Sequence, residues 1–375
     1  MKASFYTEIF IILFFFSFVT SFSQKNQLHT ISGTITEKET GNPIPLVNVY
    51  LDGTTIGTTT NLNGQYTITN IPTDTYQIIA SMIGFEQEKK SIQFTKKSTT
   101  QINFRLKTRS YKLDEISIIT ERDYVWNNNA DLFQEQFLGT SINSEECKIV
   151  NREILDFVKT KDVQLIAKAK SPLVVVNKAL GYRVFFDLKE FELSNSKEIN
   201  YNGNTRFEEL IPKNRNQKIE WEEKRKEAYN GSQRHFLTSL CKNQLIENGF
   251  YTYKLSEPNW GNLRRQDYLI PNLSGALQKV SESEWSLLFD DYIMIKYVDE
   301  WEEEGFKTYR NYLGSNIYKV LNFQTSWIKL LYGYVIFDNN GNLIEDFKNI
   351  KVFGYWGWQR VADLLPTNYL PQEIE

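Results

Sequence analysis

A continuous pattern of strands and tight turns over residues 31–85 constrains the fold of this chain more than any other feature. Residues 32–35 open a strand, and residues 47–51 alternate apolar and polar side chains with the period of two that is typical of a half-buried strand. Residues 61–64, Asn-Leu-Asn-Gly, tolerate the left-handed backbone that a hairpin turn requires, and residues 65–69 return as the next strand. The segment therefore predicts a small β-sheet domain, but it does not by itself indicate an activity.

The ordered series of these turns and strands resembles the carboxypeptidase regulatory-like family. The residues that carry the resemblance are Gly33, Gly41, Pro45, Val47-Asn48-Val49, Gly57-Thr58-Thr59-Thr60, Asn61 to Tyr66 and Ile83-Gly84-Phe85. The resemblance covers Gln27 to Leu106 and implies a seven-stranded sandwich of the transthyretin (prealbumin) type. In the family this sandwich accompanies zinc carboxypeptidase domains, precedes the plug of TonB-dependent receptors, and begins many envelope proteins of Gram-negative bacteria. An unrelated immunoglobulin-like sandwich is the alternative, and it has the same fold class.

The N-terminus is predicted to be a signal peptide over residues 1–23. Lys2 precedes a nearly unbroken apolar run, Ile9 to Phe22, and Ser21 and Ser23 supply small residues before a cleavage site at Gln24. The run is shorter than the roughly 20 residues that a membrane-spanning helix needs. A retained N-terminal anchor is the alternative to cleavage. The pattern favours export, with no transmembrane segment after the signal is removed.

The rest of the chain is long enough for two or three domains. Residues 27–108 are predicted to form the sandwich, 109–125 a linker, and 126–375 a larger α+β domain of unknown function. In that domain, residues 163–193 and 285–337 contain strand patterns and residues 219–240 an interrupted helix, so the fold class is mainly β with α+β, dominated by antiparallel sheet. Residues 113–120 resemble the segment that follows the sandwich in TonB-dependent receptors, but the remaining chain is too short for a 22-stranded barrel.

The second domain also resembles an uncharacterised region that follows this sandwich in envelope proteins of Gram-negative bacteria. The matching residues are Phe137-Leu138-Gly139, Asn177 to Tyr182, Gly231 to Phe236, Leu364-Leu365-Pro366, Tyr369 and Pro371. This resemblance implies no known chemistry.

Charge and motif content exclude several classes of function. The 43 basic and 46 acidic residues give a net charge of −3, so the chain has no positive field for nucleic acid. Its two histidines, His29 and His235, lack the His-x-x-Glu pattern of a zinc carboxypeptidase, and no other metal or cofactor motif occurs. Ser232 and His235 form a nearby Ser/His pair; they favour a helix cap, with an envelope hydrolase as the alternative.

Three residues, Trp221, Arg225 and Tyr229, recur at helical spacing and form the candidate binding site. An aromatic–guanidinium–aromatic stripe on one helix face can hold a sugar or peptide by stacking and hydrogen bonding. The alternative, which the charged residues on the other faces favour, is that the stripe packs against the protein. No catalytic or metal-binding residue is predicted.

Cys147 and Cys241 either pair in an oxidising compartment or remain separate buried thiols, and the sequence leaves both open. Taken together, the sequence predicts an exported, non-catalytic protein of the periplasm or outer membrane. Its role is predicted to be binding or scaffolding, with an envelope protein or a glycan as its partner.

Overall fold

The computed structural model describes residues 28–94, 99–109, 120–256, 268–269, 273–312, 322–344 and 349–371. The predicted signal peptide and the predicted connecting strand at 113–119 lie outside these residues. Within the described ranges, no helix combines the length and the apolar character needed to cross a membrane.

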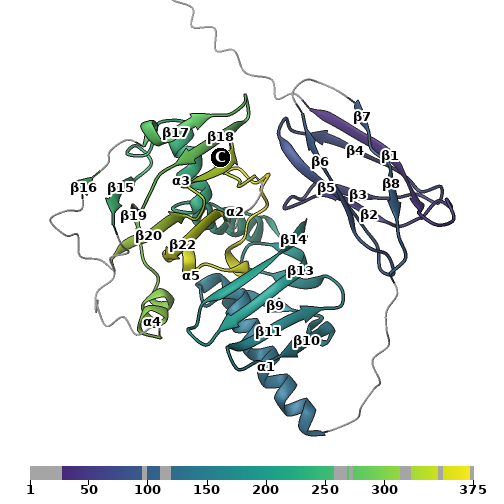
Figure 1. The fold of residues 1–375 in the computed structure, drawn as a ribbon, viewed down its shortest axis with the longest axis horizontal. Coiled ribbons are helices and arrows are strands. Elements are labelled where there is room, and N and C mark those ends of the chain that lie inside the picture. The colour runs from purple at the N-terminus through teal and green to yellow at the C-terminus, as the bar shows by residue number, and fades with distance from the viewer. Residues whose placement is uncertain are drawn as a thin grey trace, which may run out of the picture.

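The first domain is a sandwich of two sheets (Figure 1). One sheet has the order β4-β1-β7, with β8 also pairing with β1, and the other has the order β3-β2-β5-β6. Both β7 and β8 run parallel to β1, so they form one interrupted edge strand, and the sandwich has seven strands when they are counted together. The strands are β1 His29–Glu37, β2 Asn48–Leu51, β3 Gly57–Thr59, β4 Gln65–Ile71, β5 Thr75–Ser81, β6 Glu88–Gln93, β7 Thr99–Gln101 and β8 Phe104–Leu106.

The predicted turn at residues 61–64 is present and is stabilised by a side chain. The Asn61 Oδ1 atom accepts hydrogen bonds from the backbone N–H groups of Asn63 and Gln65, each at 2.9 Å. Gly64 follows with a φ of 69°, in the left-handed region that glycine adopts without strain. Apolar residues that alternate along β1 and β4, such as Ile31, Ile35 and Ile68, fill the space between the two sheets.

The second part of the chain begins with a helix, and its start corrects the predicted linker. Helix α1 spans Thr120–Leu138, whereas the sequence pattern placed a linker to residue 125. Residues 120–123 carry no apolar periodicity that would have identified the helix. Trp126 already contacts the sheet, since it packs against Phe157 and its indole N–H donates to the Leu155 carbonyl at 3.0 Å.

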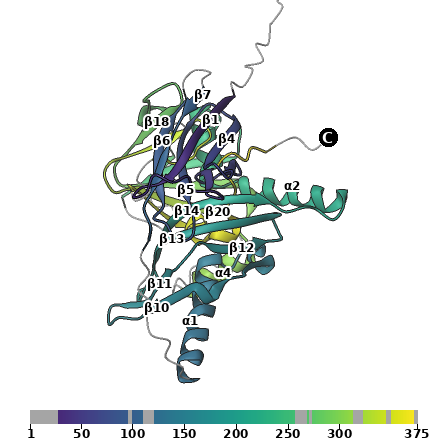
Figure 2. The same ribbon diagram turned by 90° about the vertical axis from the view of Figure 1, so that its right-hand side faces the viewer.

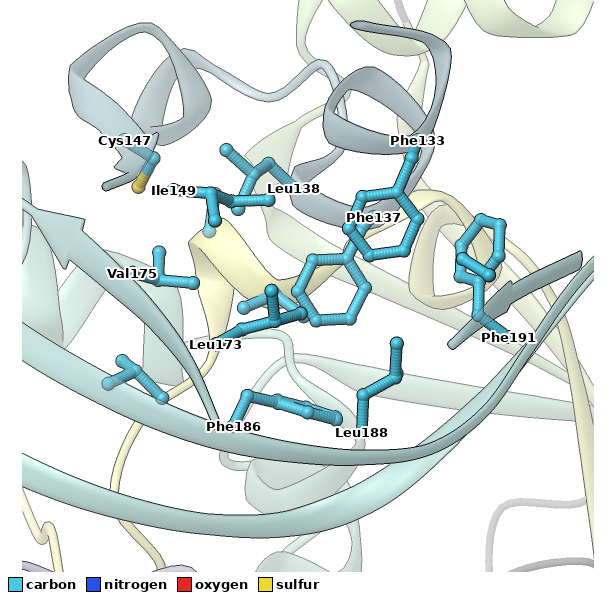
Figure 3. Packing of buried hydrophobic residues seen from close by; sticks show 14 of the residues in the cluster. Phe133, Phe137, Leu138, Cys147, Ile149, Leu173, Val175, Phe186, Leu188 and Phe191 are labelled. Carbon is cyan, nitrogen blue, oxygen red and sulfur yellow. The ribbon is translucent and has the colours of Figure 1, made fainter. Parts of the chain in front are cut away.

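A six-stranded sheet lies against α1. Its order is β10-β11-β13-β12-β9, with β14 along the other side of β13, and every pairing in it is antiparallel. Figure 3 shows Phe133 and Phe137 of α1 pointing toward Leu173, Phe186 and Leu188 on the sheet. The strands are β9 Cys147–Ile149, β10 Leu155–Val158, β11 Val163–Ala169, β12 Leu173–Asn177, β13 Tyr182–Ser194 and β14 Ile199–Glu209.

Two further sheets complete the second domain. One has the order β16-β15-β19-β20-β22, and the other has the order β17-β18-β21. Helix α3 packs on them through Phe236 and Leu240, while α2 points away to one side (Figure 2). The predicted mainly β fold with an antiparallel α+β domain is confirmed. The elements are α2 Arg215–Tyr229, α3 Gln233–Cys241, β15 Phe250–Leu255, β16 Tyr268–Leu269, β17 Leu277–Lys279, β18 Glu284–Leu288, β19 Tyr292–Trp301, α4 Glu304–Tyr312, β20 Phe323–Leu330, β21 Tyr334–Asp338, β22 Ile350–Gly354 and α5 Tyr355–Trp358.

The two cysteines are free thiols in this fold. Cys147 lies buried in β9, and Cys241 is half-buried at the end of α3. Burial raises the pKa of the Cys241 thiol to about 12, and burial also raises that of Cys147. Both side chains therefore stay protonated and behave as small apolar groups.

Candidate functional site

The predicted binding stripe on α2 is covered by protein. Trp221, Arg225 and Tyr229 are each at most 6% exposed. The indole N–H of Trp221 donates to the Lys178 carbonyl at 2.7 Å, and its ring lies so close to Gly181 that a Cβ there would come within 2.3 Å of it. These contacts match the packing alternative for Trp221.

Arg225 lies one helical turn after Trp221 and contacts the same turn. Its Nε donates to the Leu180 carbonyl at 2.8 Å, and its guanidinium lies 4.0 Å from the centre of the Tyr182 ring. An ion pair with Glu222 at 3.3 Å completes its contacts within the helix. Tyr229 differs, because its side chain lines the cavity described below. The structure thus brings only one member of the stripe to a surface that a ligand could reach.

Ser232 and His235 interact as residues of a helix cap do, through a side-chain oxygen and a backbone N–H group. Ser232 precedes α3, and its Oγ accepts the backbone N–H of His235 at 3.2 Å. The His235 Nδ1 accepts the backbone N–H of Gly231 at 3.1 Å, and burial lowers the pKa of the ring to about 4. The imidazole lone pair on Nδ1 is therefore already used, and this nitrogen is not placed to take a proton from the Ser232 hydroxyl.

Replacing the cap tests this assignment. We expect Ser232→Ala to lower the free energy of unfolding by about 1 kcal/mol, the usual effect of losing a helix N-cap. Chemical denaturation followed by tryptophan fluorescence measures it. Ser232→Asp retains an acceptor and should restore most of the loss; equal losses in both variants would contradict the capping role.

A cavity lies between the sandwich and the second domain, and three contacts described below join its walls. In the first, Gly53 and Thr54 extend β14 at its free edge. Gly53 N donates to the Thr205 carbonyl at 2.8 Å, Phe207 N donates to the Thr54 carbonyl at 2.9 Å, and Thr54 forms a parallel bridge with Arg206. Backbone hydrogen bonds therefore join the sandwich to the six-stranded sheet.

Side chains reinforce the first contact. The Asp52 carboxylate accepts the Asn204 amide at 2.5 Å and the Thr205 backbone N–H at 2.7 Å. Burial raises the pKa of Asp52, while these two donors and the backbone N–H of Gly53 oppose that rise.

The second contact is made by residues after α5. Thr367 N donates to the Gly53 carbonyl at 2.7 Å, and Asn368 exchanges two hydrogen bonds with Thr55. Gly53 has a φ of 73°, and a Cβ there would lie 2.9 Å from the Thr367 methyl group. Because any larger residue at position 53 is both strained and crowded, this junction requires glycine.

The third contact pairs two buried carboxyl groups. Asp74, just before β5, is 5% exposed, and Asp338, at the end of β21, is 3% exposed. Asn340 bridges the two groups, because its side-chain amide donates to Asp74 at 3.1 Å and its backbone N–H donates to Asp338 at 2.8 Å. The two carboxyl groups therefore lie beside each other. Beside them, the Thr75 hydroxyl donates to Glu284 at 3.0 Å.

A cavity of about 2600 Å³ lies among these contacts. The sandwich contributes one wall, which includes Tyr50, Gln77 and Ser91, and the second domain contributes the other, which includes Phe185 and Asn202. Charged groups also line it. The Arg206 guanidinium stacks 3.9 Å from the centre of the Phe185 ring, and the Lys189 ammonium donates to Asp187 and, across the cavity, to Gln87. The lining is therefore mixed, with aromatic side chains among charged groups and amides.

The sequence did not single out these cavity residues. Residues 338–342 have the composition of a turn, but Asp74, which lies beside Asp338, is 264 positions away in the chain, as the two residue numbers show. Among the described residues, no three His, Cys, Asp or Glu side chains come close enough together to hold a metal ion.

Comparison with known proteins bears on the first domain. Residues 31–118 match the model of the CarboxypepD_reg-like domain. The first domain belongs to this family. The match reaches about ten residues beyond the predicted end of the sandwich at 108, into residues whose sequence already resembled the receptor segment.

Two relatives of the CarboxypepD_reg-like domain are receptors from Formosa agariphila. TonB-dependent receptor P39 is 36% identical over 110 residues, and TonB-dependent receptor P3 is 30% identical over 108 residues. Each match covers 29% of this chain but only 10% of the receptor. The domain and these relatives support an envelope-associated protein, in agreement with the sequence prediction.

Solved structures match less closely. A putative membrane-associated protein of unknown function from Bacteroides fragilis is 14% identical, and the match covers 49% of this chain and 83% of that protein with a TM-score of 0.17. No functional inference follows from a TM-score of this size.

Proposed function

We propose that this chain is an exported, non-catalytic binding protein of the cell envelope that holds a polar ligand between its CarboxypepD_reg-like domain and its second domain. The observation that carries the proposal is the cavity of about 2600 Å³ to which both domains contribute a wall. Ligand sites commonly lie at such domain interfaces, where a few polar groups among aromatic faces fix the orientation of the ligand.

The lining favours a hydrophilic ligand, either a glycan or a segment of another envelope protein. Tyr50, Tyr76 and Phe185 offer ring faces, and Gln77 and Asn202 offer amides that both donate and accept. The similarity of the first domain to receptor domains supports an envelope location for the proposed site. We favour binding over catalysis because Ser232 and His235 are used as a helix cap and because the buried acids of the cavity wall join the two domains.

Blocking the cavity tests the proposal. Ser91 is an exposed residue of β6 that lines the cavity, and Ser91→Trp would place a large ring in it. We expect one member of a panel of soluble oligosaccharides and polar peptides to raise the melting temperature of the wild type. A ligand at 100 times its dissociation constant stabilises by about 2.7 kcal/mol, and this shift should be absent in Ser91→Trp.

The matched control is Thr67→Trp, which introduces the same ring at an exposed strand position of the sandwich that does not line the cavity. It should keep the full ligand-induced shift. Equal shifts in Ser91→Trp and Thr67→Trp would place the ligand elsewhere, and fractionation that recovers the protein outside the envelope would contradict its location.

A further inference from the structure

Asp74 and Asp338 are two acidic groups from different domains that lie in contact. No cationic side chain takes part in the hydrogen bonds described for them. Asp338 already accepts three donors: the backbone N–H groups of Asn340 and Asn342, each at 2.8 Å, and the Asn342 side-chain amide at 2.7 Å. Asp74 accepts the Thr75 backbone N–H at 2.7 Å and the Asn340 amide at 3.1 Å. Two carboxylates with these donors can hydrogen-bond to each other only if they share a proton.

We propose that this shared proton is a latch that holds the sandwich against the second domain, so that loss of the proton loosens the contact and opens the cavity. An ionised pair would place two negative charges together in a buried site, where neither is hydrated. Moving the two domains apart would relieve the repulsion, because each carboxylate could then reach water. The effect of the proton on the domain contact is the same whichever ligand the cavity holds.

The groups around the pair do not remove the need for the proton. From α3, the Arg234 charge acts on Asp338, but both of its terminal NH groups donate to the backbone carbonyls of Pro366 and Tyr369. Cys241 of α3 and Tyr76 of β5 are also near the pair. Burial and Asp338 raise the pKa of Cys241, and burial with both aspartates raises the pKa of Tyr76, so both groups stay protonated. Glu284 of β18 adds a further acid beside Thr75.

The direction of the pH effect follows from the proton count. Burial and the neighbouring Asp338 carboxylate raise the pKa of Asp74 to about 8, from about 3.8 in an exposed state. Burial also raises the pKa of Asp338. The docked form thus binds one proton more than the separated form between about pH 4 and pH 8. Its stability is complete below this window, falls as the pH rises through it, and is constant above about pH 8.

Two other acids of the interface, Asp52 and Glu284, serve as controls. Asp52 sits at the first contact and accepts the Asn204 amide and the Thr205 backbone N–H, which are both N–H donors. Glu284 accepts the Thr75 hydroxyl at 3.0 Å and the Gln93 amide at 3.3 Å, which are neutral donors. Neither acid faces a second carboxylate in these bonds.

The test is hydrogen–deuterium exchange of the backbone amides that cross the interface, those of Gly53 and Phe207, between pH 5 and pH 8 in the full chain. After correction for the intrinsic rate, their protection should fall up to tenfold per pH unit in the wild type. Amides inside the sandwich, such as those of β1 and β4, should show constant protection. Constant protection at Gly53 and Phe207 as well would overturn the proposal.

Two variants locate the proton. Asp74→Asn and Asp338→Asn each neutralise one member of the pair while keeping an acceptor oxygen, and either one should make the protection of Gly53 and Phe207 independent of pH. Glu284→Gln should retain the wild-type dependence. A wild-type slope in a folded Asp74→Asn or Asp338→Asn variant, or loss of the slope in Glu284→Gln, would assign the proton to another group and refute the latch.

Discussion

Truncating Trp221 should produce the largest loss of stability among single changes in the second domain. We expect Trp221→Ala to lower the free energy of unfolding by about 3–5 kcal/mol, because it removes a buried indole and leaves a cavity against Gly181. The variant also leaves the Lys178 carbonyl without the indole N–H that it accepts at 2.7 Å. In a domain of this size the melting temperature should fall by about 10 °C.

Two companion variants make the Trp221 prediction specific. Trp221→Phe keeps most of the buried ring but not the indole N–H, so its loss should be smaller, about 1–2 kcal/mol. Glu223→Ala changes an exposed residue of the same helix and should leave the melting temperature almost unchanged. A Trp221→Ala protein as stable as the wild type would mean that the indole is not needed for packing, and the stripe of Trp221, Arg225 and Tyr229 would again be a candidate ligand site.

Local patterns predicted the parts of this structure that local forces determine. The alternation at residues 47–51, the Asn61 turn and the break between α2 and α3 depend on neighbours in sequence, and each lies where the pattern placed it. The same reasoning failed at the start of α1. Residues 120–123 are all polar, so no apolar periodicity distinguished helix from linker.

The cavity between the domains could not be predicted in this way. Its walls depend on Gly53 meeting Thr205 and on Asp74 meeting Asp338, contacts between residues that are more than 150 positions apart in the chain. In the sequence, Asp338 is simply the first residue of an Asp-Asn-Asn-Gly-Asn turn. The three hydrogen bonds that it accepts within the turn agree with that interpretation. Only the fold shows that a second carboxyl group lies against it.

Gly33 links the family signature to the packing of the sandwich. The strand that pairs with β1 is interrupted after β7, and there the Ile102 carbonyl turns toward β1. A Cβ on Gly33 would lie 1.8 Å from the Ile102 oxygen, far inside contact distance. The Tyr66 hydroxyl donates to the same oxygen at 2.6 Å, and Ile102 N donates to the Ser32 carbonyl at 2.8 Å, so the carbonyl is held from both sides. Glycine at this position therefore has a steric cause.

We accordingly expect Gly33→Ala to destabilise the sandwich by about 3 kcal/mol, since the methyl group can be accommodated only by moving backbone. Gly41→Ala is the matched control: Gly41 has a φ of 74°, but a Cβ there meets no atom within 4 Å, so only the left-handed strain of about 1 kcal/mol remains. All 8 tryptophans lie beyond residue 118, so their fluorescence reports the second domain alone, while amide exchange in β1 and β4 reports the sandwich. Gly33→Ala should lower protection in β1 and β4 before fluorescence changes. If Gly33→Ala destabilises the sandwich no more than Gly41→Ala does, then the Ile102 carbonyl is free to move. In that case the interruption of the edge strand does not require glycine at position 33.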